Sequence, residues 1–588
     1  MKDFIKFTFA TITGLILTGI IVSILGTITI LGILASSETR TKVKENSIMV
    51  LNLSGTITEQ IHKDPLNLIF GNDYSNAGLN DILASIDKAK KHENIKGIYL
   101  KAGTLIASPA TIQEIRNALL EFKKSGKFII SYGDAYTQGN YYLCSVADQM
   151  ILNPQGSINW IGMASQPMFY KDLLDKIGIE MQVFKVGTYK SAVEPYISNS
   201  ISEANREQIS IFLNSIWNQI LDGVSQSRAI SKDSLNAYAN QLITLSAPGN
   251  YISNGMIDTL LYQSDVKEYL QSILHIDLKE SVNTLSLEDM INVEDITLPE
   301  NKSNHSIAIY YAEGGIDDMT SVDEGISSQK MCRVLQKLGE DDDIKAVVLR
   351  VNSPGGSAFG SEQIWHQVMA LKEKKPVVVS MGGYAASGGY YISCAANKII
   401  AEPTTLTGSI GIFGMIPNMQ NLLTKKLGIH IDAVKTNKFS DMGTVFRPFN
   451  PEERMHMQAE INRGYDLFIT RCANGRNMSK EAIEKIAEGR VWTGEMAKEL
   501  GLVDELGGLD KAIEIAAQEA QITDYRISSY PEPENFLMNL LYPQKEDYIN
   551  SQMQETFGEF YPYIQFIRNV QKQDPIQTRI PFELNLNL

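Results

Sequence analysis

The sequence predicts an α/β protein that is a tandem duplication of one unit, preceded by a single transmembrane helix. Three observations predict this arrangement. The chain has 588 residues, which is too many for one hydrophobic core. Segments of its two halves match at a nearly constant spacing, and an uncharged apolar run precedes the first of them. The composition, 44% hydrophobic and 21% charged, is that of an ordinary folded protein.

The apolar run at the start of the chain contains no charged residue between Lys6 and Glu38. At about 1.5 Å per residue it is long enough to cross a hydrocarbon layer of about 30 Å. A cleavable signal peptide has an apolar region of only about 7–15 residues. We therefore expect residues 1–45 to be an uncleaved anchor with a transmembrane helix over about 8–35, although residues 35–37 also resemble a cleavage site. Basic residues flank the run on both sides, so charge does not orient it.

The duplication is visible in segments that keep their register. ENIKGIYLKAG matches DDIKAVVLRVN, and KFIISYGDAYTQGNYYL matches PVVVSMGGYAASGGYYI. Both pairs lie 249 positions apart (345 − 96 and 380 − 131), and residues 176–190 match 426–440 at an offset of 250. Matches that hold register over several segments indicate a repeated structural unit.

The matches divide the chain into an anchor, two repeats and a tail. The first α/β repeat is expected over 46–290 and the second over 305–530, with a polar link between them. Residues 531–588 are expected to form a tail that packs on the protein or contacts another subunit.

Each repeat alternates short apolar runs with helical patterns, as in IKAVVLRV followed by SEQIWHQVMALKEK. This alternation predicts a parallel sheet covered by helices on both faces. Folds of this kind place their chemistry at the carboxyl ends of the strands. The motif SPGGS, at 353–357, and the loop that holds Ser387 each follow such a strand. We therefore expect both to open on the same edge of the second sheet.

Ser387 is a candidate nucleophile because small residues on both sides, in YAASGGYYIS, allow another chain to come close. The first repeat has Gln138 at the matching position and no glycine pair that matches Gly355 and Gly356. These glycines and Gly388 can direct backbone N–H groups toward a developing oxyanion. The other reading of Ser387 is a small residue that permits tight packing.

The nucleophile needs a base, and none of the seven histidines lies within ten residues of Ser387. Lys190, in the first repeat, matches Ser440 of the second, so neither repeat holds a full set of groups. Ser–Lys pairs are known catalytic variants. Lowering a lysine pKa from about 10.4 to near 7 costs roughly 4–5 kcal/mol, which burial can impose. The alternatives are that Lys190 is a solvated surface lysine and that His366, in a helical pattern, is the base.

Several function classes are disfavoured by composition. The net charge is −15 and no run of basic residues occurs, which argues against a nucleic-acid partner. The four cysteines lack CxxC spacing and the histidines are scattered, so we expect no metal site and no cofactor.

Four motifs together resemble the signal peptide peptidase A (protease IV) family, in its long, duplicated, membrane-anchored form. They are VGTYKSAVEPY, SPGGS, MGGYAASGGYYIS and TLTGSIGIFG. The resemblance covers the chain from the anchor to about residue 530. It implies repeats of the Clp protease/crotonase-like fold. It also implies a serine endopeptidase that degrades released signal peptides and other extended hydrophobic peptides.

The same resemblance implies roles for particular residues and a place in the cell. The implied roles are Ser387 as nucleophile, Lys190 as general base, Ser409 as the residue that orients the lysine, and Gly355, Gly356 and Gly388 as the oxyanion hole. The family forms homotetramers in the bacterial cytoplasmic (inner) membrane, single-pass, with the catalytic bulk on the periplasmic side. Whether the dyad is completed within one chain or between chains stays open, although the duplicated form favours one chain.

Two other functions remain as alternatives. A crotonase-like enzyme would use the same oxyanion scaffold on acyl thioesters, but would give no reason for an anchor or for a Ser–Lys pair split between repeats. An inactive membrane scaffold would have no need of both Ser387 and Lys190.

Overall fold

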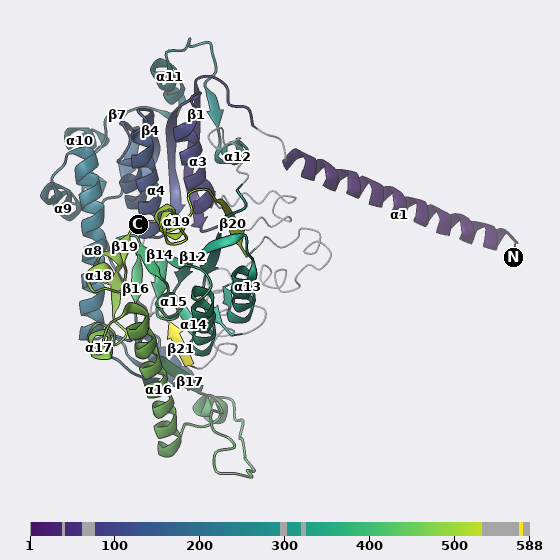
Figure 1. The fold of residues 1–588 in the computed structure, drawn as a ribbon, viewed down its shortest axis with the longest axis vertical. Helices are drawn as coiled ribbons and strands as arrows, with labels where there is room; N and C mark the ends of the chain where they lie inside the picture. Colours follow the sequence, from purple (N-terminus) through teal and green to yellow (C-terminus); the bar gives the residue numbers. More distant parts are fainter. Residues whose placement is uncertain are drawn as a thin grey trace.

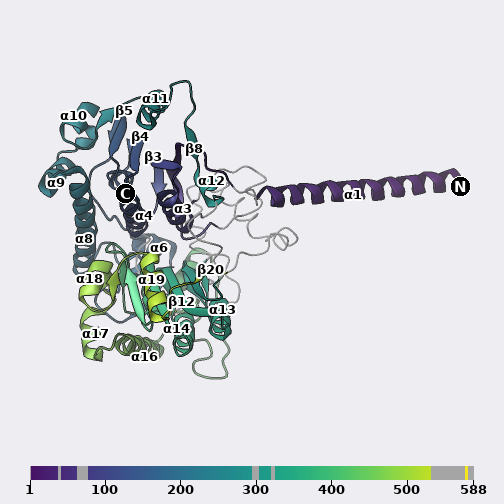
Figure 2. The ribbon, with the colours of Figure 1, turned by 45° about the horizontal axis from the view of Figure 1, so that its top comes forward.

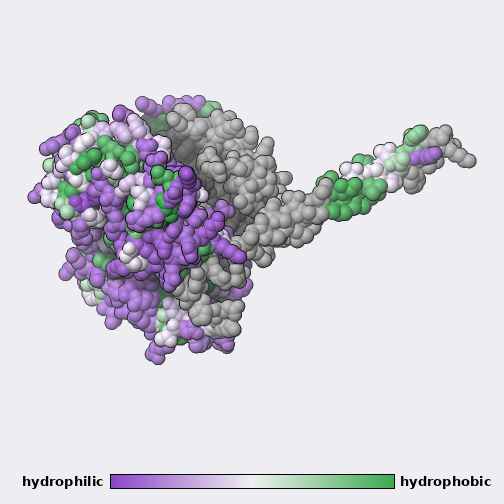
Figure 3. Space-filling view, turned by 90° about the horizontal axis from the view of Figure 1, so that it is seen from above, coloured by the Kyte–Doolittle hydropathy of each residue, from purple (hydrophilic) through white to green (hydrophobic). Residues whose placement is uncertain are grey.

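The computed structural model describes residues 2–37, 41–61, 77–293, 303–318, 325–531 and 576–579. Two α/β units lie one above the other, and the helix α1 (Lys2–Ser37) extends away from both (Figures 1 and 2). Residues 6–24 of α1 are long and apolar enough to cross a membrane, and none of this stretch is buried. Figure 3 shows hydrophobic side chains along the described surface of this helix.

The first unit is built on a seven-stranded parallel sheet, in the order β2-β1-β3-β4-β5-β7, with β8 beside β1. Its strands are β1 (Ser47–Thr58), β2 (Ala77–Gly78), β3 (Ile95–Ile106), β4 (Phe128–Tyr136), β5 (Gln149–Ile158), β7 (Thr259–Leu260) and β8 (Asn283–Leu285). The helices of the sheet region are α3 (Leu79–Lys91), α4 (Pro109–Lys123), α5 (Gln138–Cys144), α11 (Gln263–Leu274) and α12 (Leu287–Ile291). A second group of helical segments comprises α6 (Lys171–Ile177), α7 (Glu194–Ile197), α8 (Glu203–Arg228), α9 (Lys232–Asn240), η1 (Ile243–Leu245) and α10 (Pro248–Ser253).

The second unit has an eight-stranded sheet, in the order β18-β16-β14-β12-β9-β20, with β15 between β14 and β19. Its strands are β9 (Ser306–Glu313), β12 (Ile344–Ser353), β14 (Val377–Ala386), β15 (Lys398–Ala401), β16 (Leu406–Gly408), β18 (Val491–Thr493), β19 (Glu505–Leu506) and β20 (Arg526–Tyr530). Its helices are α13 (Ser328–Glu340), α14 (Ala358–Lys372), α15 (Gly388–Ser393), η2 (Leu422–Lys426), α16 (Pro451–Arg476), α17 (Lys480–Ile486), α18 (Gly494–Glu499) and α19 (Leu509–Glu519). The order β9-β12-β14-β15 repeats β1-β3-β4-β5, so the duplication predicted from sequence is confirmed in the topology.

The strand β12 shows why its apolar run forms a central parallel strand. Val347 and Leu349 pack in one buried cluster, and Ala346 and Val348 pack in another, under α19. A strand buried on both faces needs apolar residues at successive positions. The helix α14 that follows is N-capped by Ser357, whose Oγ accepts a hydrogen bond from the Gly360 N–H at 3.1 Å.

A third sheet joins the two units, in the order β11-β10-β13-β21-β17-β6. Its strands are β6 (Glu180–Lys185), β10 (Ile316–Asp317), β11 (Ile326–Ser327), β13 (Gly355–Ser357), β17 (Phe413–Asn418) and β21 (Ile576–Arg579). The first-unit strand β6 runs antiparallel to β17 of the second unit over six residue pairs. This pairing fixes the two units against each other beside the site described below.

A buried charge cluster also crosses between the units. The Arg350 guanidinium donates to Glu59 Oε2 at 2.8 Å and to Glu114 Oε2 at 2.7 Å, and all three side chains are buried. Removal of one member of such a set would leave a buried charge without its partner, which is strongly destabilising. The cluster therefore favours one relative placement of the two units.

Candidate active site

Ser387 lies at the sharp turn between β14 and α15, with φ 56° and ψ −113°. This is an uncommon backbone conformation for a residue with a side chain, and such outliers concentrate at functional sites. The turn is held because the Ser387 N–H donates to the Gly408 carbonyl at 2.8 Å. A Cβ on Gly389 would lie 2.6 Å from the Ser353 carbonyl oxygen, which explains a glycine that closely follows the serine.

Lys190 follows β6 in the first unit and reaches into the second. An added Cβ on Gly489 would lie 2.7 Å from the Lys190 Cβ, and one on Gly411 would lie 3.3 Å from its Cδ. The aliphatic stem therefore lies beside two glycines that leave room for it. Its Nζ is 2.7 Å from Ser387 Oγ, and both atoms belong to one chain.

The surroundings of Lys190 disfavour a positive charge. The side chain is fully buried, and burial lowers the pKa of its ammonium well below the usual value. Glu194, the nearest carboxylate along the chain, instead accepts hydrogen bonds from Ser202 and from the Asn205 amide, the latter at 2.9 Å. It therefore does not offset the burial of the amine.

Ser409 provides two further contacts to the amine. Its carbonyl oxygen lies 3.2 Å and its Oγ 3.1 Å from Lys190 Nζ. The residue has φ 49°, and its N–H donates to the Arg490 carbonyl at 2.7 Å. Together with Ser387 Oγ, these two oxygens fix the position of the amine.

The three glycines predicted from the sequence meet next to Ser387. Gly355 has φ +100°, and an added Cβ there would lie 2.7 Å from the Gly388 nitrogen. Its own N–H already donates to Ser353 Oγ at 3.2 Å. The Gly388 N–H belongs to the first residue of α15, and Gly356 follows in β13.

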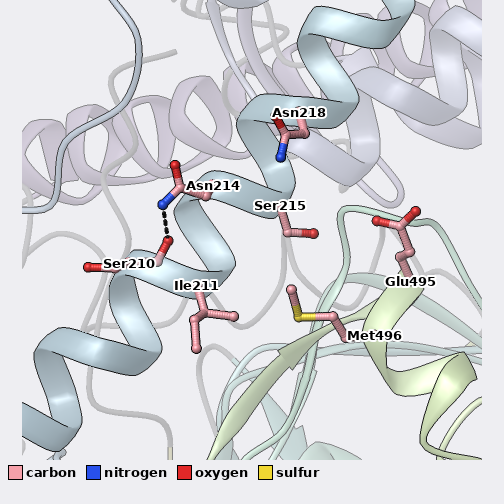
Figure 4. Close-up of a pocket in the computed structure, with 7 residues that line it drawn as sticks. All are labelled: Ser210, Ile211, Asn214, Ser215, Asn218, Glu495 and Met496. Atoms are coloured by element: carbon pink, nitrogen blue, oxygen red, sulfur yellow. Dashed lines mark hydrogen bonds between the residues drawn. The ribbon is translucent and has the colours of Figure 1, made fainter.

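Two other candidate positions, His366 and a surface pocket, do not place a base beside a serine as Lys190 and Ser387 do. His366 is exposed on α14. A surface pocket between α8 and α18, drawn in Figure 4, includes Ser215 and Glu495 but no lysine or histidine among its lining residues. Ser215 Oγ lies 3.1 Å from Thr493 Oγ1, another hydroxyl, rather than beside a basic nitrogen as Ser387 does.

Comparison with known families agrees with this geometry. The profile of Peptidase family S49 matches residues 121–276 and 369–523, more than half of the chain and part of each repeat. This chain belongs to peptidase family S49. The profile named Clp protease matches residues 299–406 of the S49 chain, which include Gly355, Gly356 and Ser387.

Several curated relatives cover most of the S49 chain. It is 34% identical over 513 residues to "Protease 4" of Haemophilus influenzae, covering 85% of this chain and 82% of that one. It is 39% identical to "Protease 4" of Salmonella typhi, covering 76% and 73% of the two chains. It is 32% identical to "Serine protease SPPA, chloroplastic" of Arabidopsis thaliana, covering 82% and 70%. The protein is therefore a serine peptidase of family S49 with duplicated Clp-protease-like domains.

One element near the site was not expected from sequence. The strand β21 lies between β13 and β17, although the tail was predicted only to pack or to contact another subunit. The short run IQTR carries a weak alternation, but no local pattern reveals which distant strands it joins. The rest of the predicted tail, 532–575 and 580–588, lies outside the described residues.

Proposed function

We propose that this S49 peptidase is a membrane-anchored serine endopeptidase in which Ser387 is the nucleophile and Lys190 the general base. The observation that carries the proposal is the 2.7 Å distance between a fully buried amine and a serine hydroxyl. A neutral amine at hydrogen-bonding distance is what a hydroxyl nucleophile requires for activation.

In the proposed reaction, Lys190 Nζ accepts the proton of Ser387 Oγ as the oxygen attacks a peptide carbonyl. Backbone N–H groups at Gly388 and at the Gly355–Gly356 pair stabilise the oxyanion, and the Gly355 N–H exchanges its hydrogen bond to Ser353 Oγ for one to the oxyanion. The ammonium then donates its proton to the leaving amine, and water hydrolyses the acyl-enzyme with Lys190 again as base. Ser409 holds the amine toward Ser387 throughout.

The proposal also covers where the protein lies and which peptides it cleaves. Residues 6–24 of α1 have the length and apolarity of a membrane span. The resemblance to signal peptide peptidase A supports a place in the bacterial inner membrane, with the bulk of the protein on the periplasmic side. The resemblance to signal peptide peptidase A supports released signal peptides and other extended hydrophobic peptides as substrates. We keep the division into an anchor to 45, repeats over 46–290 and 305–530, and a tail.

Two exposed segments support assembly into a homotetramer. At the offset of 250, the counterparts of β6 and β17 are residues 430–435 and 163–168. Neither counterpart is a strand, and in the first of them Val434 is fully exposed. Because β6 and β17 pair inside one chain, 430–435 of one copy can pair in the same way with 163–168 of the next. Such a head-to-tail contact gives a ring when its rotation closes, and the proposed homotetramer is such a ring.

The test of the dyad is a pH–rate profile on a peptide ester. Wild type should show an ascending limb that reports the base, and Lys190→Ala should lose that limb with most of the rate. Lys485→Ala, at an exposed lysine of α17, is the matched control and should behave as wild type. An unchanged profile in Lys190→Ala rejects the base.

A serine-directed phosphonate tests the nucleophile independently. Labelling that is present in wild type and lost in Ser387→Ala supports the peptidase. Absence of labelling in a folded preparation would instead favour an acyl-thioester enzyme or an inactive scaffold.

A further inference from the structure

A short segment of the second unit, residues 488–490, lies between the loop that carries Lys190 and the loop that carries Ser409. The first carbonyl of this segment accepts a hydrogen bond from the Tyr189 N–H at 3.0 Å, directly before Lys190 in the chain. The carbonyl of Arg490 accepts one from the Ser409 N–H at 2.7 Å. The segment therefore holds both the backbone next to the buried lysine and the residue that contacts its amine.

The same segment is also joined to the turn that carries the nucleophile. It leads directly into β18, which pairs antiparallel with β16, and Val491 is opposite Gly408 in this pairing. The Gly408 carbonyl accepts the hydrogen bond from the Ser387 N–H at 2.8 Å. A displacement of 488–490 would therefore be felt by every side chain of the proposed catalytic group.

The side chain of Arg490 reaches across to the first unit, where α8 runs down beside the second unit (Figure 1). The guanidinium donates to Glu207 Oε1 of α8 at 2.9 Å and to the Tyr189 hydroxyl at 3.2 Å. Its Cζ lies 4.6 Å from the centre of the Tyr189 ring and 4.6 Å from that of the Trp492 ring, and aromatic faces attract a cation at such distances. Arg490 thus holds Tyr189 with its side chain while its carbonyl holds Ser409.

Gln208, also on α8, supports the same junction from the first unit. Its side chain is buried, and its Nε2 donates to the Tyr189 carbonyl and to Ser191 Oγ, both at 3.1 Å. These two acceptors belong to the residues on either side of Lys190. Its Oε1 accepts a hydrogen bond from the Val491 N–H at 3.2 Å. A buried polar network of this kind fixes the backbone that it joins.

Packing alone does not explain an arginine at position 490. Its Nε is buried and has no hydrogen-bond partner within the part of the chain that the structure describes, which costs free energy. A methionine would fill the space beside the two rings without that cost. The ion pair adds little to compensate, because 51% of the Glu207 side chain is exposed and exposed pairs contribute little stability. The arginine is better explained by what it holds in place.

We propose that Arg490 is a positioning residue for the general base, and that it grips Tyr189 so that the adjacent Lys190 keeps its amine at Ser387 and away from water. This inference rests on the proposed function, because it treats Lys190 as the base. Arg490 does not itself take part in proton transfer. It acts by preventing the lysine loop of the first unit from separating from the second unit.

Release of this grip would change the basicity of Lys190. The amine contacts hydroxyl and carbonyl oxygens, and burial is what lowers its pKa. A loop that opens admits water, so the pKa should rise toward the ordinary value of about 10.4. Charged groups on the elements packed around the lysine do not contact its amine in the described residues; they are Glu194, Glu207, Glu488 and Arg490.

The experiment compares pH–rate profiles of the full chain in detergent on the peptide ester, with rates divided by the number of sites that the phosphonate finally labels. In Arg490→Met the ascending limb of kcat/KM should move about one unit to higher pH. On that limb kcat should fall about tenfold and should recover above it, and KM should not change. Arg490→Lys keeps the charge without the planar fork and should shift the limb about half as far.

A second variant separates positioning from a direct effect of charge. Glu207→Ala leaves the guanidinium without its carboxylate, so the grip loosens and the limb should again move to higher pH, by less than in Arg490→Met. The loss of a nearby anion would by its charge alone move the limb to lower pH, because an anion favours the ammonium form. A shift to lower pH in Glu207→Ala would therefore overturn the positioning role.

Arg228→Met is the matched control. Arg228 ends α8, far along the helix from Glu207, and pairs with Asp258 at 2.8 Å with 9% of its side chain exposed. Its replacement should lower stability but should leave the limb where it is in wild type.

Three outcomes would reject the inference. An unmoved limb in both Arg490 variants, while Lys190→Ala loses its limb, refutes this inference alone. Fewer labelled sites in Arg490→Met with an unmoved limb would show that Arg490 only stabilises the fold. An unchanged profile in Lys190→Ala refutes the proposed function, and this inference with it.

Discussion

Replacement of Lys190 by methionine should change how the stability of the protein depends on pH. The folded-state pKa of Lys190 is lowered by burial, whereas in the unfolded chain it is about 10.4. Between these two values the unfolded state binds one more proton than the folded state, so the free energy of unfolding rises with pH. The penalty for the buried amine is therefore full at low pH and disappears as pH rises through the unfolded value. Methionine does not titrate, so the stability of Lys190→Met has no such dependence on pH.

The change of stability with pH follows from the complete burial of Lys190 without a neighbouring carboxylate. Each pH unit inside the window adds about 1.4 kcal/mol to the stability of wild type relative to the variant. Methionine fills a similar volume but leaves the Ser409 carbonyl without the amine, which costs about 1–3 kcal/mol. That cost does not depend on pH, so it does not affect the slope of the stability difference plotted against pH.

The assay is urea unfolding of both proteins in detergent at several values between pH 7 and pH 10. Lys485→Met, at an exposed lysine, controls for the loss of a lysine as such and should follow wild type in parallel. Parallel lines for wild type and Lys190→Met would refute the reasoning, because they would mean that Lys190 keeps its proton when the protein folds.

Three further predictions concern the support of the site. Ser409→Ala removes one hydrogen bond to Lys190 and should lower kcat roughly three- to tenfold, with the ascending limb of the pH–rate profile at lower pH, as steady-state kinetics will show. Arg350→Met leaves two buried carboxylates without their cation and should cost about 3–5 kcal/mol of unfolding free energy at neutral pH, with a smaller loss near pH 5, where carboxylates protonate. Burial raises the pKa of Glu402 to about 8, so wild type loses stability as pH rises through that value. At pH 9 the free energy of unfolding of Glu402→Gln should therefore exceed that of wild type by at least about 2 kcal/mol. Equal unfolding free energies at pH 9 would contradict this prediction.

The sheet and its active edge could be predicted from sequence because their signals are local. The continuous apolar runs of β12 and β14 can be buried only in a covered parallel sheet. The SPGGS motif and Ser387 follow these two strands, and this placement alone predicted that they lie together. The contrast between repeats singled out Ser387 and Lys190, but their 2.7 Å separation depends on how the units dock.

The features that sequence did not reveal depend on pairing between distant segments. Arg350 lies in an apolar strand pattern, and nothing near it in sequence indicates two carboxylate partners from the other unit. Residues 176–190 and 426–440 match in sequence, yet only the first copy contains a strand, β6. The difference arises because β6 has β17 as a partner within the chain, whereas no strand among the described residues pairs with 430–435.

The amine and the hydroxyl of the site lie 197 positions apart in the sequence. A ribosome therefore completes the lysine-bearing repeat long before it reaches the serine, and the later repeat must dock before the two atoms meet. Until then the emerging polypeptide has a solvated, protonated lysine and an unactivated alcohol, so the proposed mechanism gives it no activated nucleophile during synthesis. Splitting the proposed dyad between repeats thus delays activity until both repeats have folded and docked.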